Sequence, residues 1–291
     1  MGILKRAITA DASAVAIAID TTDIVTEIEK IHQTSAVTTA ALGRLSTAAS
    51  LIGYSLKNKG DSVTVRLDGK GPAGVLIAVA DYKGNVKSYL SNPVVEIPLN
   101  KHGKLDVAGA VGKNGTLSII KDLGLKEPYS GTIPIVSGEI AEDIAAYFAT
   151  SEQIPTVCGL GVLVNPDLSV NVAGGYLVQL LPFAPESVIE QIEKNVNALP
   201  SVTQMMSSGV TPEELVMKLL DGLDPNILDE SEVKYECDCS RERVSRALIS
   251  LGAAELDEMI AEQKDTKVQC HFCNKEYSFT PSDLSKLKKR G

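Results

Sequence analysis

Four cysteines near the end of the sequence constrain its fold more than any other feature. They form two close pairs, Cys237 with Cys239 and Cys270 with Cys273. Two pairs of thiolates suit a tetrahedral site for one zinc ion, since soft sulfur ligands favour zinc over hard cations such as magnesium. The sequence therefore predicts that these four cysteines together bind one zinc ion, with a sulfur atom at each of its four positions.

The residues around each pair predict how the sulfurs are positioned. Residues 267–269 and 276–279 resemble the two strands of a zinc knuckle, with the second pair between them. A single residue separates the first pair, which is unusual because structural zinc sites generally place two or more between paired ligands. Ser240 follows directly and is a good N-cap for a helix over 241–251, which would fix the direction of Cys239.

The length and composition indicate an ordinary globular protein with more than one domain. The chain has 291 residues, 44% of them apolar and 22% charged, and no tryptophan. Residues 234–291 are too few and too poor in aromatic residues to rely on a core alone, so a metal staple is expected there. We therefore expect a C-terminal zinc domain over 234–291, in which the cysteines could form a redox switch.

The remainder of the chain predicts an α+β fold. Residues 1–182 read as a mixed α/β core domain, with β-hairpins and with one long helix or two between 22 and 58. The hairpins are expected at 75–90 and at 158–178. Residues 183–233 contain short helical segments broken by glycine, proline and acidic residues, and we interpret them as a helical linker whose apolar faces need a surface to cover.

Several residue types found in other functional sites have simpler explanations here. Cys158 lies in an apolar strand and is expected to be a buried thiol. His271 lies between two cysteines, but four thiolates already complete a zinc shell. The pair Met205 and Met206 is expected to pack within the linker, with an adaptable client surface as the alternative. Gly69-Lys70-Gly71 reads as a hairpin turn, because no helix start with Lys-Ser/Thr follows it.

The sequence argues against an enzyme and against several kinds of partner. A catalytic zinc usually has three protein ligands and an open position, which four cysteines do not leave. The net charge of −9 argues against nucleic acid or an acidic membrane as partner. Neither a signal peptide nor an 18-residue apolar run is visible, so a cytoplasmic location is expected.

The residues alone leave two functions open. Four thiolates on one Zn²⁺ carry a formal charge of −2, and five cations close in sequence could offset it: Lys234, Arg241, Arg243, Lys267 and Lys275. Thiolates are the form that oxidants attack, and loss of a structural metal can unfold a small domain. A redox switch is therefore physically possible. The alternative is a structural zinc module that mediates a constitutive protein or RNA contact.

The cysteine spacing resembles that of the Hsp33 family of redox-regulated chaperones. Three further segments resemble it too: GKGPAG at 69–74, YFATSEQIPT at 147–156 and AGGYLVQLLP at 173–182. The resemblance extends over essentially the whole chain.

The resemblance implies a cytosolic, ATP-independent holdase. In the reduced form all four cysteines would bind one zinc ion and the protein would be inactive. Oxidation would form the disulfides Cys237–Cys239 and Cys270–Cys273 and release the zinc ion. The zinc domain and linker would then lose structure, and the protein would form a homodimer that binds unfolding client proteins. No catalytic residue is implied.

Overall fold

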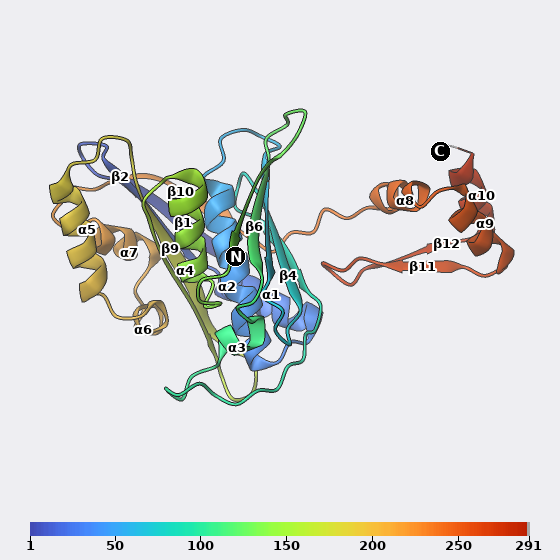
Figure 1. Cartoon of the computed structure of the whole chain (residues 1–291), viewed down its shortest axis with the longest axis horizontal. Helices are drawn as coiled ribbons and strands as arrows, with labels where there is room; N and C mark the ends of the chain where they lie inside the picture. The colour runs from blue at the N-terminus through green and yellow to red at the C-terminus, as the bar shows by residue number, and fades with distance from the viewer. Residues whose placement is uncertain (290–291) are drawn as a thin grey trace. The chain divides into compact units, whose positions relative to one another are not determined.

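The computed structural model describes residues 1–289, and the chain divides into two compact units. The first unit is Met1–Glu236, and the second begins at Cys237. The sheets and helices of Figure 1 confirm the predicted α+β class. The predicted boundaries at residues 182 and 233, drawn from changes in the character of the sequence, stay a prediction.

The first unit contains two five-stranded antiparallel sheets. Sheet A has the order β10-β1-β2-β9-β8. Its strands are β1 (Gly2–Ile8), β2 (Ala14–Asp20), β8 (Thr156–Val164), β9 (Val170–Leu180) and β10 (Asn226–Val233). Sheet B has the order β5-β4-β3-β6-β7. Its strands are β3 (Ser62–Asp68), β4 (Val75–Asp81), β5 (Val86–Leu90), β6 (Thr116–Asp122) and β7 (Tyr129–Pro134). Both predicted hairpins are confirmed, as β4–β5 and β8–β9.

A nearly fully buried helix forms the centre of the first unit. The apolar stretch predicted as one helix or two is two helices, α1 (Thr22–His32) and α2 (Ala36–Tyr54). Helix α2 lies between the two sheets and packs against strands of both (Figure 1). Its small residues permit this close packing: a Cβ on Gly53 would lie 2.6 Å from the carbonyl oxygen of Asp81.

Two further helical segments complete this core. The short helix α3 (Val107–Val111) contacts α2, and α4 (Ala141–Tyr147) packs on β8. Helix α4 continues directly into one turn of π-helix, η1 (Phe148–Glu152). Helix α4 begins only at Ala141, because residues 136–140 form a loop around the side chain of Asp143.

Three helices cover the other face of sheet A. They are α5 (Glu186–Ala198), α6 (Val202–Ser207) and α7 (Pro212–Leu219). Their buried side chains form a cluster with β2 and β9 that includes Ile192, Met205 and Leu219. The apolar faces of the linker helices, which were expected to need a surface to cover, therefore lie on sheet A (Figure 1). Met205 is buried and Met206 half-buried in this cluster, as the packing interpretation predicted.

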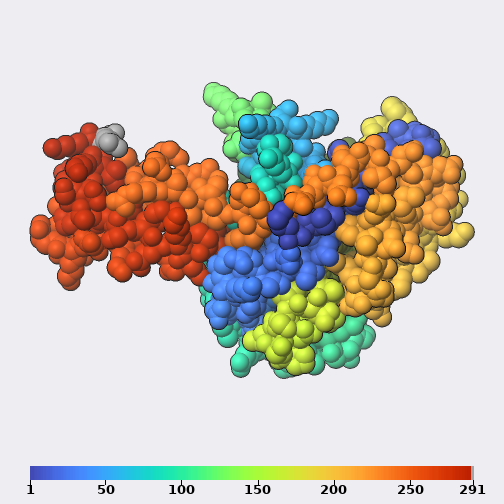
Figure 2. All heavy atoms as spheres, turned by 180° about the vertical axis from the view of Figure 1, so that it is seen from behind, coloured from blue at the N-terminus to red at the C-terminus, as the bar shows by residue number. Residues whose placement is uncertain are grey.

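The last part of the predicted helical linker is a strand. β10 pairs antiparallel with β1 and forms one edge of sheet A. Figure 2 shows it in orange on the surface, beside the blue amino-terminal strand. Val233 alone among its residues is buried. The expectation of helix over residues 226–233 is therefore wrong, because pairing with β1 rather than local propensity determines the structure there.

The second unit is built on a small core of its own. It contains α8 (Arg241–Ser250), α9 (Ala253–Ala261), the hairpin β11 (Thr266–Gln269) and β12 (Glu276–Phe279), and α10 (Pro281–Lys288). The predicted knuckle strands and the helix after Ser240 are confirmed. The buried core consists of six side chains: Leu248, Leu256, Tyr277, Phe279, Leu284 and Leu287. Among the described residues of both units, no helix combines the length and apolar character that crossing a bilayer requires.

Candidate metal centre

The four cysteines predicted as ligands converge at one place in the second unit. The sulfur atoms of Cys237, Cys239, Cys270 and Cys273 all lie within 4.8 Å of one another. The Sγ atoms of Cys237 and Cys270 are 3.7 Å apart, and those of Cys239 and Cys273 are 3.4 Å apart. All four residues are half-buried. Such a cluster is close enough to hold one metal ion.

Local backbone structure directs the sulfurs toward this point. In the knuckle, the Cys270 amide donates to the Lys275 carbonyl at 2.9 Å, and the Asn274 amide donates to the Cys270 carbonyl at 2.8 Å. Asn274 adopts a left-handed conformation with φ of +58°, which asparagine tolerates better than most residues. At the first pair, Ser240 caps α8 by accepting from the Arg243 amide at 3.2 Å.

A tyrosine links the sulfur cluster to the core of the second unit. The Tyr277 hydroxyl donates a hydrogen bond to Cys239 Sγ at 3.1 Å. Burial opposes ionisation of Cys239, but the hydrogen bonds from Tyr277 and the neighbouring cysteines hold its pKa below the ordinary value. Burial raises the pKa of Cys237. Cys237 and Cys239 are thus electrostatically unequal, and the thiolate is favoured at Cys239.

Four of the five cations expected to offset the thiolate charge pair with carboxylates. Arg243 pairs with Asp238, and Arg241 pairs with Asp283 at 3.0 Å. The three lysines among these cations also have partners other than the sulfur atoms. Lys267 pairs with Glu276, Lys234 pairs with Glu236, and Lys275 lies over the Tyr277 ring. These exposed pairs share their charge with carboxylates, so hydrogen bonds to sulfur are the more direct stabilisation of thiolates here.

The other candidate residues lie outside the cluster. Cys158 is in β8 of the first unit, where burial of the thiol raises its pKa to about 12. The group of side chains that could hold a metal ion does not include His271. Tyr277 was missed by sequence reasoning, since its hydrogen bond to Cys239 joins residues 38 positions apart in the chain.

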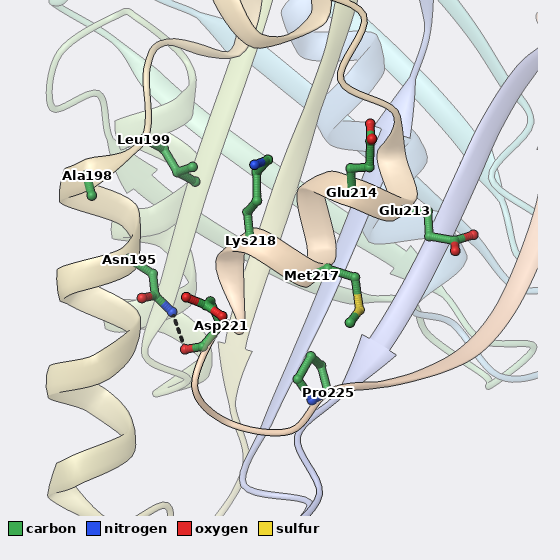
Figure 3. A pocket seen from close by; sticks show the side chains of 9 residues that line it. All are labelled: Asn195, Ala198, Leu199, Glu213, Glu214, Met217, Lys218, Asp221 and Pro225. Carbon is green, nitrogen blue, oxygen red and sulfur yellow. Dashed lines mark hydrogen bonds between the residues drawn. The ribbon is translucent and has the colours of Figure 1, made fainter.

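A second feature missed by the sequence is a hollow between α5 and α7 (Figure 3). It has a volume of about 610 Å³, and Glu213, Glu214 and Met217 of α7 line it. Glu213 pairs with Lys5, and Glu214 accepts from the Thr211 amide at 2.8 Å. Because these two carboxylates already have partners within the chain, the hollow does not present a ready acidic site.

The fold and the cluster together define an α+β protein whose small second unit carries four cysteines close enough to hold a metal ion. The family model described as "Hsp33 protein" matches residues 3–280. The 33 kDa chaperonin of Agathobacter rectalis is 47% identical over 285 residues, covering 98% of this chain and 99% of that protein. The 33 kDa chaperonin of Clostridioides difficile is 48% identical over 284 residues, covering 98% and 97%.

A solved structure agrees with the sequence comparisons. The crystal structure of the 33 kDa chaperonin (heat shock protein 33 homolog) from Thermotoga maritima superimposes with a TM-score of 0.90 at 36% identity, covering 99% of this chain and 98% of that chain. The chain therefore belongs to the Hsp33 family, which confirms the resemblance seen in its sequence. Its relatives are named as chaperonins and not as enzymes, as the four-cysteine site predicted.

Proposed function

We propose that this protein is a redox-regulated, ATP-independent holdase chaperone. The reduced chain binds one zinc ion through Cys237, Cys239, Cys270 and Cys273 and is inactive. Oxidation forms two disulfides, releases the zinc ion and exposes a surface that binds unfolding client proteins. The observation that carries the proposal is the convergence of the four sulfurs within 4.8 Å, in a unit with only a small core.

The size of that core makes the second unit dependent on its ligands. Six buried side chains are few for a unit of this length. Structural zinc contributes about 10–16 kcal/mol to the folding of small metal-binding domains at neutral pH. Zinc would supply a Lewis-acidic centre that keeps all four sulfurs as thiolates. Without it, the core alone is not expected to hold the second unit together.

The oxidation has a simple balance with peroxide as the oxidant. One thiolate attacks a peroxide oxygen, the O–O bond breaks, and a sulfenic acid and hydroxide form. A second thiolate then attacks the sulfenic sulfur, forms the S–S bond and displaces a second hydroxide. Two protons convert the two hydroxides to water. The formation of each disulfide thus transfers two electrons to one peroxide molecule. The two disulfides together use all four cysteines of the cluster.

The proposed pairing is Cys237–Cys239 and Cys270–Cys273, as the family resemblance implies. The two sulfur pairs at 3.7 Å and 3.4 Å instead join a cysteine of one pair to a cysteine of the other. Distance in the reduced form therefore does not select the proposed pairing. Its support is chain proximity, because neighbouring cysteines stay close once the second unit has unfolded. Peptide mapping of the oxidised chain by mass spectrometry distinguishes the two pairings.

The surface exposed on activation is proposed to include the linker, residues 183–233, and the face of sheet A beneath it. Helices α5 to α7 bury an apolar cluster there, and β10 joins this region to the first cysteine through only three residues. Loss of structure in residues 234–291 would remove the anchor of β10. Exposed apolar patches of this kind bind other proteins. We propose unfolding proteins as clients and a homodimer as the oxidised form.

The remaining proposals concern location and the alternative function. The protein is proposed to act in the cytoplasm, where thiols are kept reduced until oxidative stress. No nucleic acid partner is proposed, since the net charge is −9. The alternative is a structural zinc module with a constitutive protein or RNA partner. A pull-down under reducing conditions would recover a fixed partner only in that case.

The test compares reduced and oxidised protein as suppressors of aggregation. A thermally unfolding test protein is heated without ATP in the presence of either form, with oxidation by hypochlorous acid. We expect the oxidised form to suppress light scattering and the reduced form to have little effect. Protein whose thiols are blocked before oxidation is the control. Equal suppression by reduced and oxidised protein would refute the switch.

A further inference from the structure

Cys239 is the cysteine of the cluster to which the hydroxyl of Tyr277 donates a hydrogen bond. Tyr277 lies in β12, opposite Val268 of β11. Alternate residues of β12 are buried, so Tyr277 and Phe279 face the core while Glu276 and Ser278 are exposed. Only 8% of Tyr277 is exposed, and its hydroxyl donates to Cys239 Sγ at 3.1 Å.

Cys239 is also the cysteine fixed to the core of the second unit. Its side chain packs against the cluster that contains Tyr277 and Phe279. The next residue, Ser240, caps α8, so the backbone on that side is held as well. The hydrogen bond therefore joins two rigid elements, β12 and the start of α8, through a single sulfur atom.

A phenol that donates to a thiolate changes the chemistry of the sulfur. The hydrogen bond withdraws electron density from the sulfur, which makes the thiolate a weaker nucleophile toward peroxide. A hydrogen bond to a charged acceptor is stronger than one between neutral groups. A disulfide sulfur is a much poorer acceptor, so this hydrogen bond is lost on oxidation. The bond thus favours the reduced, metal-bound state.

We propose that Tyr277 is a positioning residue that sets the oxidant threshold of the cysteine cluster by hydrogen bonding to Cys239. It holds the Cys239 sulfur within the four-cysteine cluster and slows its attack on peroxide. The oxidation itself keeps the balance given above, with peroxide as the electron acceptor. This inference rests on the proposed zinc site and names a residue that regulates it.

The test compares the full-length wild-type chain with Tyr277→Phe, which removes one hydroxyl and keeps the ring. Each chain is loaded with cobalt as a spectroscopic probe and, separately, with zinc. Removing a partner that hydrogen-bonds to a metal ligand typically lowers metal affinity by about 10–100-fold. We expect about tenfold weaker zinc binding in competition with a chelator. Zinc release under peroxide is expected to be several-fold faster.

The cobalt spectrum separates a role at the sulfur from a general loss of stability. Without the hydrogen bond, the sulfur-to-cobalt charge-transfer bands shift to longer wavelength, because the thiolate gives up electron density more easily. The matched control is Tyr235→Phe. It removes a hydroxyl that donates to the Ser88 carbonyl at 3.0 Å, close in sequence to the first cysteine. Its bands are expected to coincide with those of the wild type.

A second variant keeps the proposal testable if the Tyr277→Phe chain fails to bind metal. Incorporation of 3-fluorotyrosine at position 277 keeps the ring and strengthens the donor, so the bands shift to shorter wavelength and zinc release slows. Unchanged bands and release rates in the substituted chains would overturn the role of Tyr277 while leaving the zinc site intact. Failure of the wild-type chain to bind cobalt or zinc would overturn both proposals.

Discussion

At the scale of single residues, Asp143 organises a whole loop. The carboxylate is fully buried and accepts hydrogen bonds from the backbone amides of Val136, Ser137, Gly138 and Ile140, at 2.7 to 3.0 Å. Ile140 is held with φ of +76°, a conformation that a β-branched residue rarely adopts. The Asp143 side chain thus accepts the hydrogen bonds of four backbone amides that have no partner in a helix or strand.

We predict that Asp143→Ala lowers the free energy of unfolding by about 3 kcal/mol or more, because it leaves several buried amides without an acceptor. Urea unfolding followed by circular dichroism measures the change. Asp122→Ala is the control, since that carboxylate is exposed and accepts from the Gly124 amide at 3.1 Å. A similar loss of stability in both variants would show that the loop does not depend on Asp143.

Cys158 is predicted to take no part in the redox response. Burial of its thiol raises the pKa to about 12, so almost no thiolate exists at neutral pH. An alkylating reagent at pH 8 should leave Cys158 unmodified in the native chain and modify all five cysteines in urea. Mass spectrometry of the peptides measures this. Rapid native labelling of Cys158 would contradict the prediction.

The same shift predicts a pH dependence of stability. The unfolded thiol ionises at about pH 8.5, whereas the native thiol stays protonated to about pH 12. The native state therefore binds more protons in this range, and the contribution of Cys158 to stability falls as the pH rises through it. Cys158→Ala should show a shallower fall between pH 9 and 11 in urea titrations. Parallel curves for the two chains would disprove the contribution.

At the scale of elements, β10 is an edge strand fastened by polar contacts more than by burial. Asp229 accepts from Arg6 Nε at 3.1 Å and from the Tyr54 hydroxyl at 2.6 Å. The Arg6 guanidinium also lies 5.5 Å from the centre of the Tyr54 ring. A strand held in this way can separate from its neighbour at modest cost, which suits an element that borders the proposed linker.

Asp229→Ala is predicted to loosen β10 without unfolding the first unit. Hydrogen exchange of the β1 and β10 amides should become about tenfold faster or more, because the hydrogen bonds from Arg6 and Tyr54 to the carboxylate are lost. Exchange in sheet B should not change. Glu232→Ala, on the same strand, provides the comparison. Unchanged exchange in Asp229→Ala would show that the ladder to β1 alone holds this strand.

The elements also show how far sequence reasoning extends. Alternating or helical apolar patterns predicted β4, β5, β8, β9 and the two helices α1 and α2, and ligand chemistry predicted the four cysteines. β1 and β10 were not predicted, because their pairing joins residues more than two hundred positions apart. Tyr277 was missed for a similar reason: its role depends on a hydrogen bond to Cys239, 38 positions earlier in the chain, and neither local sequence signals that contact.

At the scale of the whole molecule, the two units differ in what stabilises them. The first unit has a large apolar core around α2, whereas the second has six buried side chains and a cysteine cluster. A metal chelator under reducing conditions is predicted to unfold the second unit and leave sheet B folded. Limited proteolysis should then cut first after residue 236. Equal protection of the second unit with and without chelator would refute its dependence on metal.

The central claim is that metal release and chaperone activity are one event. The most direct measurement titrates oxidant into the reduced, zinc-loaded chain and follows two signals together, zinc bound by a chromogenic chelator and suppression of aggregation of an unfolding test protein. The proposed switch predicts that both rise over the same range of oxidant and reverse together when reductant and zinc are restored. Full zinc release and four oxidised cysteines with no change in suppression would contradict it.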